Sequence, residues 1–169
     1  MHTFTPVFIK NILVVVGAFL GGFYFTRMFH EPTSLVGGLW AVISSIIVLE
    51  ATHTETFASA KNRIRGTLIG AIVSGVYLFY FPFTIPGFVA AIAVGVLICF
   101  LFGLPESIKL TGITISVVMI VSTIAKDLHP FVNAGLRFIE SAIGAGVAVV
   151  VALVAFITEE NILRKQNKK

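Results

Sequence analysis

The feature that most constrains the fold of this chain is a stretch of 40 residues, Gly66 to Pro105, that contains no Lys, Arg, Asp or Glu. A helix crosses the hydrocarbon core of a bilayer in about 20 residues, so this stretch is long enough for two crossings. Pro82, Pro86 and Gly87 mark the turn between them. Only 12% of the 169 residues are charged, whereas soluble domains carry about 25%. The sequence therefore predicts an all-α integral membrane protein with a single domain, residues 1–169.

Alternating apolar runs and polar turns predict six transmembrane helices. They are expected at residues 11–28, 35–49, 66–81, 87–102, 110–125 and 138–157, followed by a short basic tail at 158–169. Pro32 ends the first helix and Ser34 is placed to cap the second, while Pro105 is placed in the first turn of the fifth. The run that begins at Ile12 lacks a small-x-small cleavage site, so we expect a retained span and not a signal peptide.

The distribution of basic residues predicts the orientation. Six spans put both termini on one side, and with the termini inside, nine basic residues lie in inner segments and three in outer loops. The inner ones are Lys10, Lys61, Arg63, Arg65, Lys109, Arg164, Lys165, Lys168 and Lys169, and the outer ones are Arg27, Lys126 and Arg137. Because Lys and Arg favour the cytoplasmic side, both termini are expected in the cytoplasm. The net charge of +4 is thus a topology signal and does not indicate nucleic-acid binding.

The chain also contains a weak internal repeat. A shift of 74 residues lays the third span on the sixth with eight identities in twenty positions. The pairs are Phe57/Phe131, Ala60/Ala134, Arg63/Arg137, Ile69/Ile143, Gly70/Gly144, Ala71/Ala145, Val73/Val147 and Val76/Val150. Chance matching of Gly-, Ala- and Val-rich helices is the alternative. Since each unit has three spans, the second would insert upside down, which predicts two inverted three-helix repeats at residues 11–82 and 86–157.

Three arginines are candidates for a substrate pathway. Arg63 and Arg65 are expected at the inner mouth of the third span and Arg137 at the outer mouth of the sixth. If residues 55–62 are already helical, Thr54 is placed as their cap. A positive charge at each mouth would attract an anion. The alternative is that these side chains extend to lipid phosphates and only anchor the helices.

Two acidic groups accompany the arginines. Glu140 follows Arg137 by three residues, a spacing that favours a structural ion pair over a proton-coupling role. Glu50, His53 and Glu55 form a polar cluster after the second span, where we expect a solvated loop. No second histidine or cysteine lies near them, so no metal site is predicted.

The second and fifth spans are both short and hold corresponding places in the two halves. Short segments in matching positions point to a transport site, so the path is predicted between these two spans. Trp40 lies inside the second span, where it either packs between helices or lines the path; packing is favoured. Cys99 is the single cysteine, so no intrachain disulfide is possible.

The segments WAVI at 40–43, RIRGTLIGA at 63–71 and RFIESAIG at 137–144 resemble the signature of the fusaric acid resistance and aromatic acid exporter family. The resemblance implies a six-helix bacterial inner-membrane protein that exports aromatic carboxylic acids or similar organic anions. Plant aluminium-activated malate channels are distantly similar, which implies a dimeric anion pathway. Unlike the larger exporters, this chain has one six-helix unit and no sizeable cytoplasmic domain.

Two functions from different classes remain open at this point. The first is an organic-anion exporter or channel, working as a homo-oligomer, with a dimer favoured. Its predicted pathway residues are Arg63, Arg65, Arg137, Glu140, Trp40 and Glu50. The second is a membrane scaffold that binds a partner protein without transporting anything. No nucleophile–base pair, metal motif or cofactor loop is visible, so neither an enzyme nor a cofactor is predicted.

Overall fold

The computed structural model describes residues 4–166, without the side chains of residues 4–7, 159 and 161–166. Its described part is helical, and the six expected helices are present. They are α1 (Phe4–Phe29), α2 (Ser34–Val48), α3 (His53–Tyr80), α4 (Ile85–Leu101), α5 (Ile108–Ile124) and α6 (Pro130–Gln166), with single 3-10 turns η1 (Glu31–Thr33) and η2 (Pro105–Ser107). The all-α prediction is confirmed.

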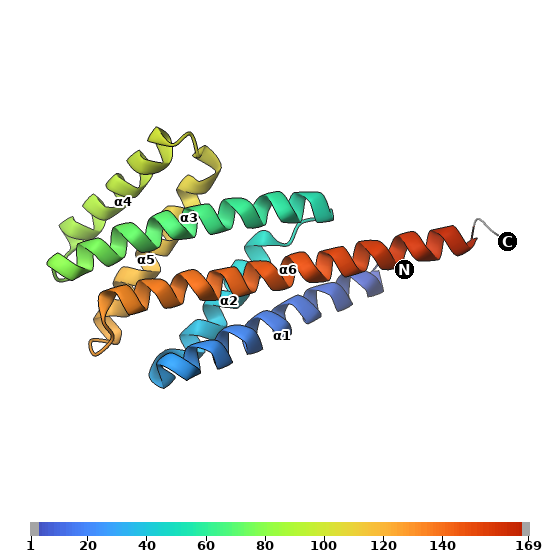
Figure 1. The fold of residues 1–169 in the computed structure, drawn as a ribbon, viewed down its shortest axis with the longest axis horizontal. Coiled ribbons are helices and arrows are strands. Elements are labelled where there is room, and N and C mark those ends of the chain that lie inside the picture. The colour runs from blue at the N-terminus through green and yellow to red at the C-terminus, as the bar shows by residue number, and fades with distance from the viewer. Residues whose placement is uncertain (1–3, 167–169) are drawn as a thin grey trace.

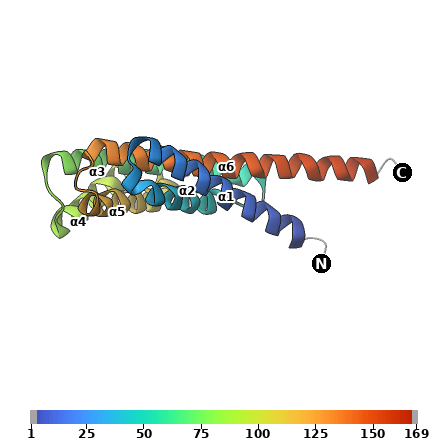
Figure 2. The same ribbon diagram turned by 90° about the horizontal axis from the view of Figure 1, so that it is seen from below.

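The helix pair α3 and α6 forms the centre of the bundle. The two helices run antiparallel and side by side, as Figures 1 and 2 show. On one side α2 packs against α6 and α1 covers both, and on the other side α5 packs against α3 and α4 covers both. Among the described residues α2 and α5 make no contact with each other. The central pair therefore connects the two halves of the chain.

Two glycines set the closest approaches between these helices. A Cβ at Gly144 of α6 would collide with the carbonyl oxygen of Ala41 in α2. A Cβ at Gly70 of α3 would lie 2.7 Å from the Thr114 Cβ of α5. Because small residues let helix backbones meet closely, these positions bring each central helix against its flanking partner.

Three helices begin at least seven residues before the predicted spans: α1 at Phe4, α3 at His53 and α6 at Pro130. α3 starts at His53, so the polar segment before the third span is helical, but Thr52 and not Thr54 is its cap. The Glu55 N–H donates to Thr52 Oγ1 at 3.2 Å and the Thr52 N–H donates to Glu55 Oε2 at 3.3 Å. This reciprocal capping box selects Thr52 because the glutamate must follow the cap by three residues. α6 starts at Pro130, eight residues before 138, since proline is favoured in the first turn of a helix.

The turns differ from the prediction at two further positions. Ser34 is the first residue of α2 and not its cap, because η1 leads directly into the helix and the Ser34 N–H donates to the Glu31 carbonyl. Pro105 opens η2 and does not lie within the first turn of α5. The lone Cys99 is buried, and its sulfur lies 3.1 Å from Thr111 Oγ1.

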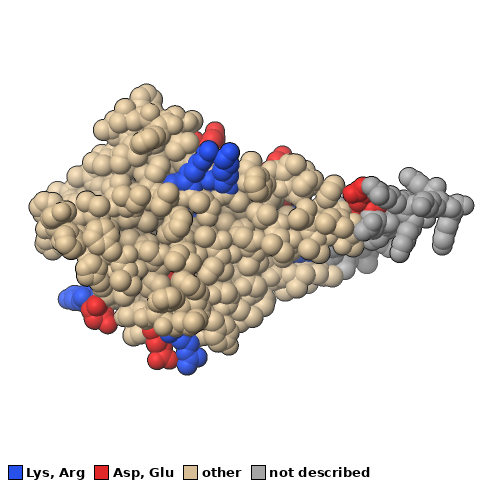
Figure 3. All heavy atoms as spheres, viewed as in Figure 1, with Lys and Arg blue, Asp and Glu red and all other residues tan. Residues whose placement is uncertain are grey.

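The surface has the character of a membrane protein. In the part of the chain that the structure describes, four segments are long and apolar enough to cross a bilayer: Phe8–Phe29, Glu31–Val48, Pro105–Ile124 and Pro130–Thr158. α4 is a shorter apolar helix, and α3 combines a polar first half with an apolar second half. In Figure 3 most charged side chains on the visible face gather at two opposite margins, with an almost uncharged band between them. Such a band is expected where lipid tails surround the protein.

Candidate functional site: a buried arginine cluster

The interior of the bundle holds a polar cluster that three helices build in the same way. α2 contributes Trp40 and Ser44, α3 contributes Arg63 and Thr67, and α6 contributes Arg137 and Ser141. In each pair the residues are four apart and so share one helix face. Every one of these side chains is at most 2% exposed. Thr26 of α1 and Glu140 of α6, both 0% exposed, complete the cluster.

Arg63 is held by neutral groups. Its Nε donates to Ser141 Oγ at 3.0 Å and its Nη2 donates to Ser44 Oγ at 2.8 Å. The guanidinium carbon lies 4.8 Å from the centre of the Trp40 ring, a cation–π contact. No carboxylate pairs with Arg63 among the described residues, and its Nη1 has no hydrogen-bond acceptor there. Arg63 is therefore a buried cation without a counter-ion in the part of the chain that the structure describes.

Arg137 is held differently, by a carboxylate on its own helix. Its Nη2 lies 2.9 Å from Glu140 Oε1, which also accepts a hydrogen bond of 2.5 Å from Thr26 Oγ1. None of the three guanidinium nitrogens of Arg137 has a hydrogen-bond partner in the described structure, and neither has Glu140 Oε2. The ion pair is thus real but incomplete, since each member keeps unused hydrogen-bonding capacity.

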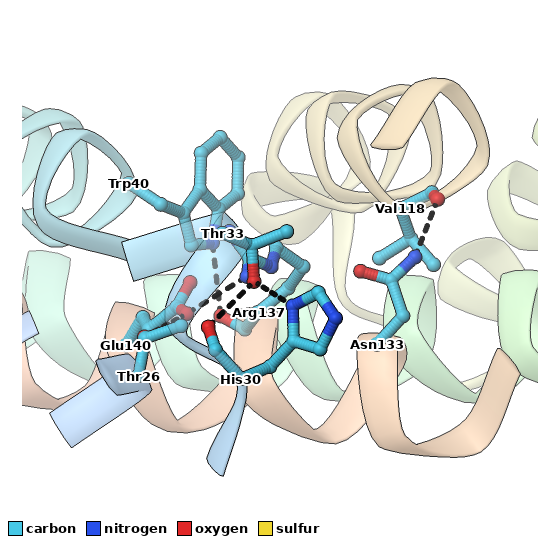
Figure 4. Close-up of polar contacts among 8 residues, drawn as sticks. All are labelled: Thr26, His30, Thr33, Trp40, Val118, Asn133, Arg137 and Glu140. Atoms are coloured by element: carbon cyan, nitrogen blue, oxygen red, sulfur yellow. Dashed lines mark hydrogen bonds and ion pairs between the residues drawn. The ribbon is translucent and has the colours of Figure 1, made fainter. Parts of the chain in front are cut away.

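Trp40 connects the two arginines. Figure 4 shows its indole beside Arg137, and Trp40 Nε1 donates to the Arg137 carbonyl oxygen at 2.9 Å. The same ring lies against the Arg63 guanidinium. Ser44 donates to Ser141 Oγ at 3.1 Å, and the Thr67 and Ser141 hydroxyls lie 3.2 Å apart. The eight side chains therefore form one connected network.

The electrostatics of the cluster favour an added anion. Two guanidinium groups are matched by one carboxylate, which leaves a formal charge of +1 inside the bundle. Buried charges are costly unless they are paired and hydrogen-bonded, and unused donors add to that cost. A small anion that accepted hydrogen bonds from the free guanidinium N–H groups would satisfy both needs.

The structure brings four of the six predicted pathway residues together: Arg63, Arg137, Glu140 and Trp40. The predicted ion pair between Arg137 and Glu140 is confirmed. The expected positions of Arg63 and Arg137 at opposite mouths are wrong, because both are fully buried and Ser141, one turn from Arg137, accepts from Arg63. The alternative in which these two arginines extend to lipid phosphates is wrong for the same reason.

The other two predicted residues lie outside the cluster. Arg65 follows Arg63 by two residues, which turns it to the opposite side of α3, where it is exposed. Glu50 is exposed just after α2, where its backbone carbonyl accepts from Lys10 Nζ at 3.2 Å. His53, expected in a solvated loop, is instead the first residue of α3, and its ring centre lies 4.0 Å from that of Phe156.

A hollow of about 570 Å³ lies between the C-terminal end of α2 and the N-terminal end of α5. Glu50, Glu55, Glu106 and Lys109 contribute its charged groups, over a floor formed by α3. Its formal charge is negative, whereas a positive mouth was expected. The basic residues of the α3 polar segment are therefore not the groups that line this hollow.

Sequence reasoning missed the neutral members of the cluster, Ser44, Thr67, Ser141 and Thr26. A signal for two of them was available: the 74-residue shift lays Thr67 on Ser141, each four residues after a matched arginine. It also missed Asn133, which is 1% exposed and donates from Nδ2 to the Val118 carbonyl at 2.9 Å, as Figure 4 shows. Nothing in the spacing of Ser44 or Thr26 distinguishes them from the other hydroxyl residues.

A second polar group joins the two turns at the opposite end of the bundle. His30 lies between the Thr33 hydroxyl, at 2.9 Å from Nδ1, and the Asp127 carboxylate, at 3.1 Å from Nε2. The hydrogen bond with His30 lowers the pKa of Asp127 below its ordinary value. The contact links the α1–α2 turn to the α5–α6 turn. Within the described residues no group of three or more His, Cys, Asp or Glu side chains could hold a metal ion.

Comparison of the sequence with models of protein families gives a match. The model of the fusaric acid resistance protein-like family matches residues 18–151, which include every member of the buried cluster. Comparison with curated proteins and with solved structures finds no match. The matched segment covers the C-terminal part of α1 from residue 18 and all of α2 to α5, and it extends well into α6. The chain belongs to the fusaric acid resistance protein-like family of membrane proteins.

Proposed function

We propose that this protein moves organic anions across the bacterial inner membrane, with aromatic carboxylic acids as the cargo and export as the direction. Membrane transport or resistance is what the family indicates. The observation that carries the proposal is the buried Arg63, which has no counter-ion among the described residues and keeps a free Nη1 donor. A carboxylate of the cargo would supply the missing negative charge.

In this proposal the two arginines have different tasks. Arg63 binds the cargo carboxylate, because its partners within the described residues are serine hydroxyls and the Trp40 ring. Arg137 is reached by exchange: Glu140 already holds one face of it, and a cargo carboxylate would take over that position. Glu140 is thus a tethered competitor of the cargo. Competition of this kind lets an anion bind and leave again, which conduction requires.

The architecture that we propose is a pair of inverted repeats, α1–α3 and α4–α6. Equivalent helices make equivalent contacts: α2 packs on α6 as α5 packs on α3, and α3 packs on α6 across the centre. The matched glycines Gly70 and Gly144 serve these two equivalent contacts. The arginines matched by the repeat, Arg63 and Arg137, both lie in the central cluster. Transport sites commonly lie at such repeat interfaces.

We further propose that both termini lie in the cytoplasm and that two copies assemble. The two charged margins in Figure 3 are consistent with six crossings. The path would run between α2 and α5, which are not in contact and whose inner ends flank the hollow. In this proposal a second copy covers the open side of the path.

Flux in proteoliposomes tests this function. We expect Arg63→Ala or Arg137→Ala to abolish uptake of a labelled aromatic carboxylate. Arg27→Ala is the matched control, since that arginine is 53% exposed and pairs with Glu31 at 3.3 Å on the outer surface. Unchanged flux in both cluster variants would remove the site assignment, and absence of flux in the wild-type protein would favour the scaffold alternative.

A further inference from the structure

The exposed basic residues of α3 lie on the rim of an apolar groove that the proposed transport site does not use. Lys61 and Arg65 are one helical turn apart and both are exposed. Neither has an ion-pair partner among the described residues. Figure 3 shows a compact group of blue spheres beside α3 at the edge of the uncharged band. Lys61 and Arg65 therefore place two positive charges, neither with an ion-pair partner in the described structure, side by side on the surface of α3.

The groove itself lies between α3 and α6 and has a volume of about 580 Å³. Ile64 of α3 and Ala142, Ala145 and Gly146 of α6 line it beside the two basic residues. Gly146 is exposed, and a Cβ added there would meet no atom within 4 Å. The small side chains thus leave an open, apolar channel along the helix pair, and its only charged lining groups are Lys61 and Arg65.

The depth of the groove in the membrane follows from the neighbouring turn. The Ser107 hydroxyl of η2 donates to the Asn62 carbonyl at 3.2 Å, which ties the α4–α5 turn to α3 directly after Lys61. A turn between two membrane-crossing helices lies at the membrane edge, because lipid tails cannot satisfy its backbone groups. Lys61 and Arg65 therefore lie at headgroup level, and the groove follows α3 from Arg65 back to Phe57 and α6 from Ala142 to Val150.

We infer that this groove binds one anionic phospholipid of the cytoplasmic leaflet, with its phosphate on Lys61 and Arg65 and an acyl chain over Ala142 and Gly146. Basic pockets between helices on the cytoplasmic side are typical sites for anionic headgroups. The apolar lining fits an acyl chain, which neither a soluble anion nor a peptide backbone would match. The inference rests on the proposed cytoplasmic orientation but not on the identity of the transported anion.

Native mass spectrometry of the full-length protein tests the site. The probes are phosphatidylglycerol and phosphatidylcholine with identical acyl chains. We expect one phosphatidylglycerol adduct per chain, bound at least about tenfold more tightly than phosphatidylcholine, since each lost charge-assisted hydrogen bond weakens binding by about that factor. The double variant Lys61→Ala/Arg65→Ala should lose this preference. Lys109→Ala is the matched control, because it removes an exposed lysine that lies outside the groove.

The variant Gly146→Leu separates a site from general surface attraction. It fills the groove and leaves both basic side chains in place, so binding of phosphatidylglycerol should fall as in the double variant. Equal retention of both lipids by the wild type, unchanged adducts in Gly146→Leu, or an equal loss in Lys109→Ala would each overturn the inference. A change of oligomeric state in Gly146→Leu without a change in lipid adducts would show that a second copy covers the groove. None of these readouts measures flux.

Discussion

Arg63 and Arg137 occupy matching places in the two halves of the chain, and both are 0% exposed. Their surroundings nevertheless differ. Arg137 faces Glu140 at 2.9 Å, whereas Arg63 faces two serine hydroxyls and the ring of Trp40. Under the 74-residue shift, Glu140 falls on Gly66, which has no side chain to offer.

The difference separates a neutralised cation from one that is not neutralised. A buried ion pair can be structural, but a buried guanidinium without a carboxylate remains costly until something negative binds to it. Arg63 is therefore the arginine that would gain most from binding an anion. The pair of Arg137 and Glu140 illustrates how a carboxylate can be bound in this cluster. Glu140 then serves as an internal example of a bound carboxylate.

The largest effect is expected for Arg137→Met. This change leaves Glu140 as a buried carboxylate whose only remaining partner is Thr26. Breaking one side of a buried pair costs about 3–5 kcal/mol of folding stability. We expect the apparent melting temperature of the purified protein to fall steeply at neutral pH. Restoring neutrality with Arg137→Met/Glu140→Met should recover most of the loss, and a double variant as unstable as the single one would contradict the pairing.

Glu140→Gln should lower the folding stability, and an added anion should restore part of it. The variant leaves Arg137 in the same unpaired state as Arg63, at a comparable cost of about 3–5 kcal/mol. Because a ligand that binds only the folded state stabilises it, an added aromatic carboxylate should raise the melting temperature of Glu140→Gln by more than that of the wild type. Equal shifts in the two proteins would show that Glu140 does not compete with the cargo.

Arg63→Met should change stability less than Arg137→Met. The serines left behind can still bond to each other and to the Trp40 carbonyl, so the cost is about 1–2 kcal/mol from lost hydrogen bonds and packing. Comparing the melting temperatures of Arg63→Met and Arg137→Met shows how much more stability is lost when the removed arginine has a carboxylate partner. A loss for Arg63→Met as large as for Arg137→Met would indicate that Arg63 has a counter-ion after all.

Much of the fold was predictable because hydropathy directly reports helices that face lipid. The six helices and the pair Arg137 and Glu140 follow from apolar runs and from spacing along one helix. The depth of Arg63 did not follow, because a charge just before an apolar run is equally compatible with a membrane mouth and with a helix that continues far into the bundle. Only the packing of α2 and α6 around α3 decides between them.

The network of hydroxyl groups was harder to predict for a different reason. Ser44 and Ser141 become partners of Arg63 through contacts between helices that are far apart in the chain. Serine is common in membrane helices, where it also bonds to its own backbone, as Ser74 does with the Gly70 carbonyl at 2.6 Å. Its presence in a span therefore says little about a site until the tertiary contacts are known.

The smallest effect is expected between the α1–α2 and α5–α6 turns, where Asp127→Asn removes an exposed contact with His30. Because the pKa of Asp127 is lowered in the folded protein, its contribution to stability is present above its ordinary value of 3.8 and is lost as the pH falls through the lowered value. The wild type and Asp127→Asn should thus differ slightly in melting temperature at neutral pH and converge in acid. A difference that is still undiminished once the pH lies below the lowered pKa of Asp127, or that grows in acid, would contradict this assignment.

Arg63 is a buried cation without a counter-ion among the described residues, and we propose that it binds a carboxylate. The most direct measurement is the change in melting temperature that benzoate causes in detergent-purified wild type, Arg63→Gln and the surface control Arg27→Gln. We expect benzoate to stabilise the wild type and the control to the same extent and to leave Arg63→Gln unchanged. An equal benzoate shift in Arg63→Gln would contradict the claim, because the anion would then bind without the one arginine that needs it.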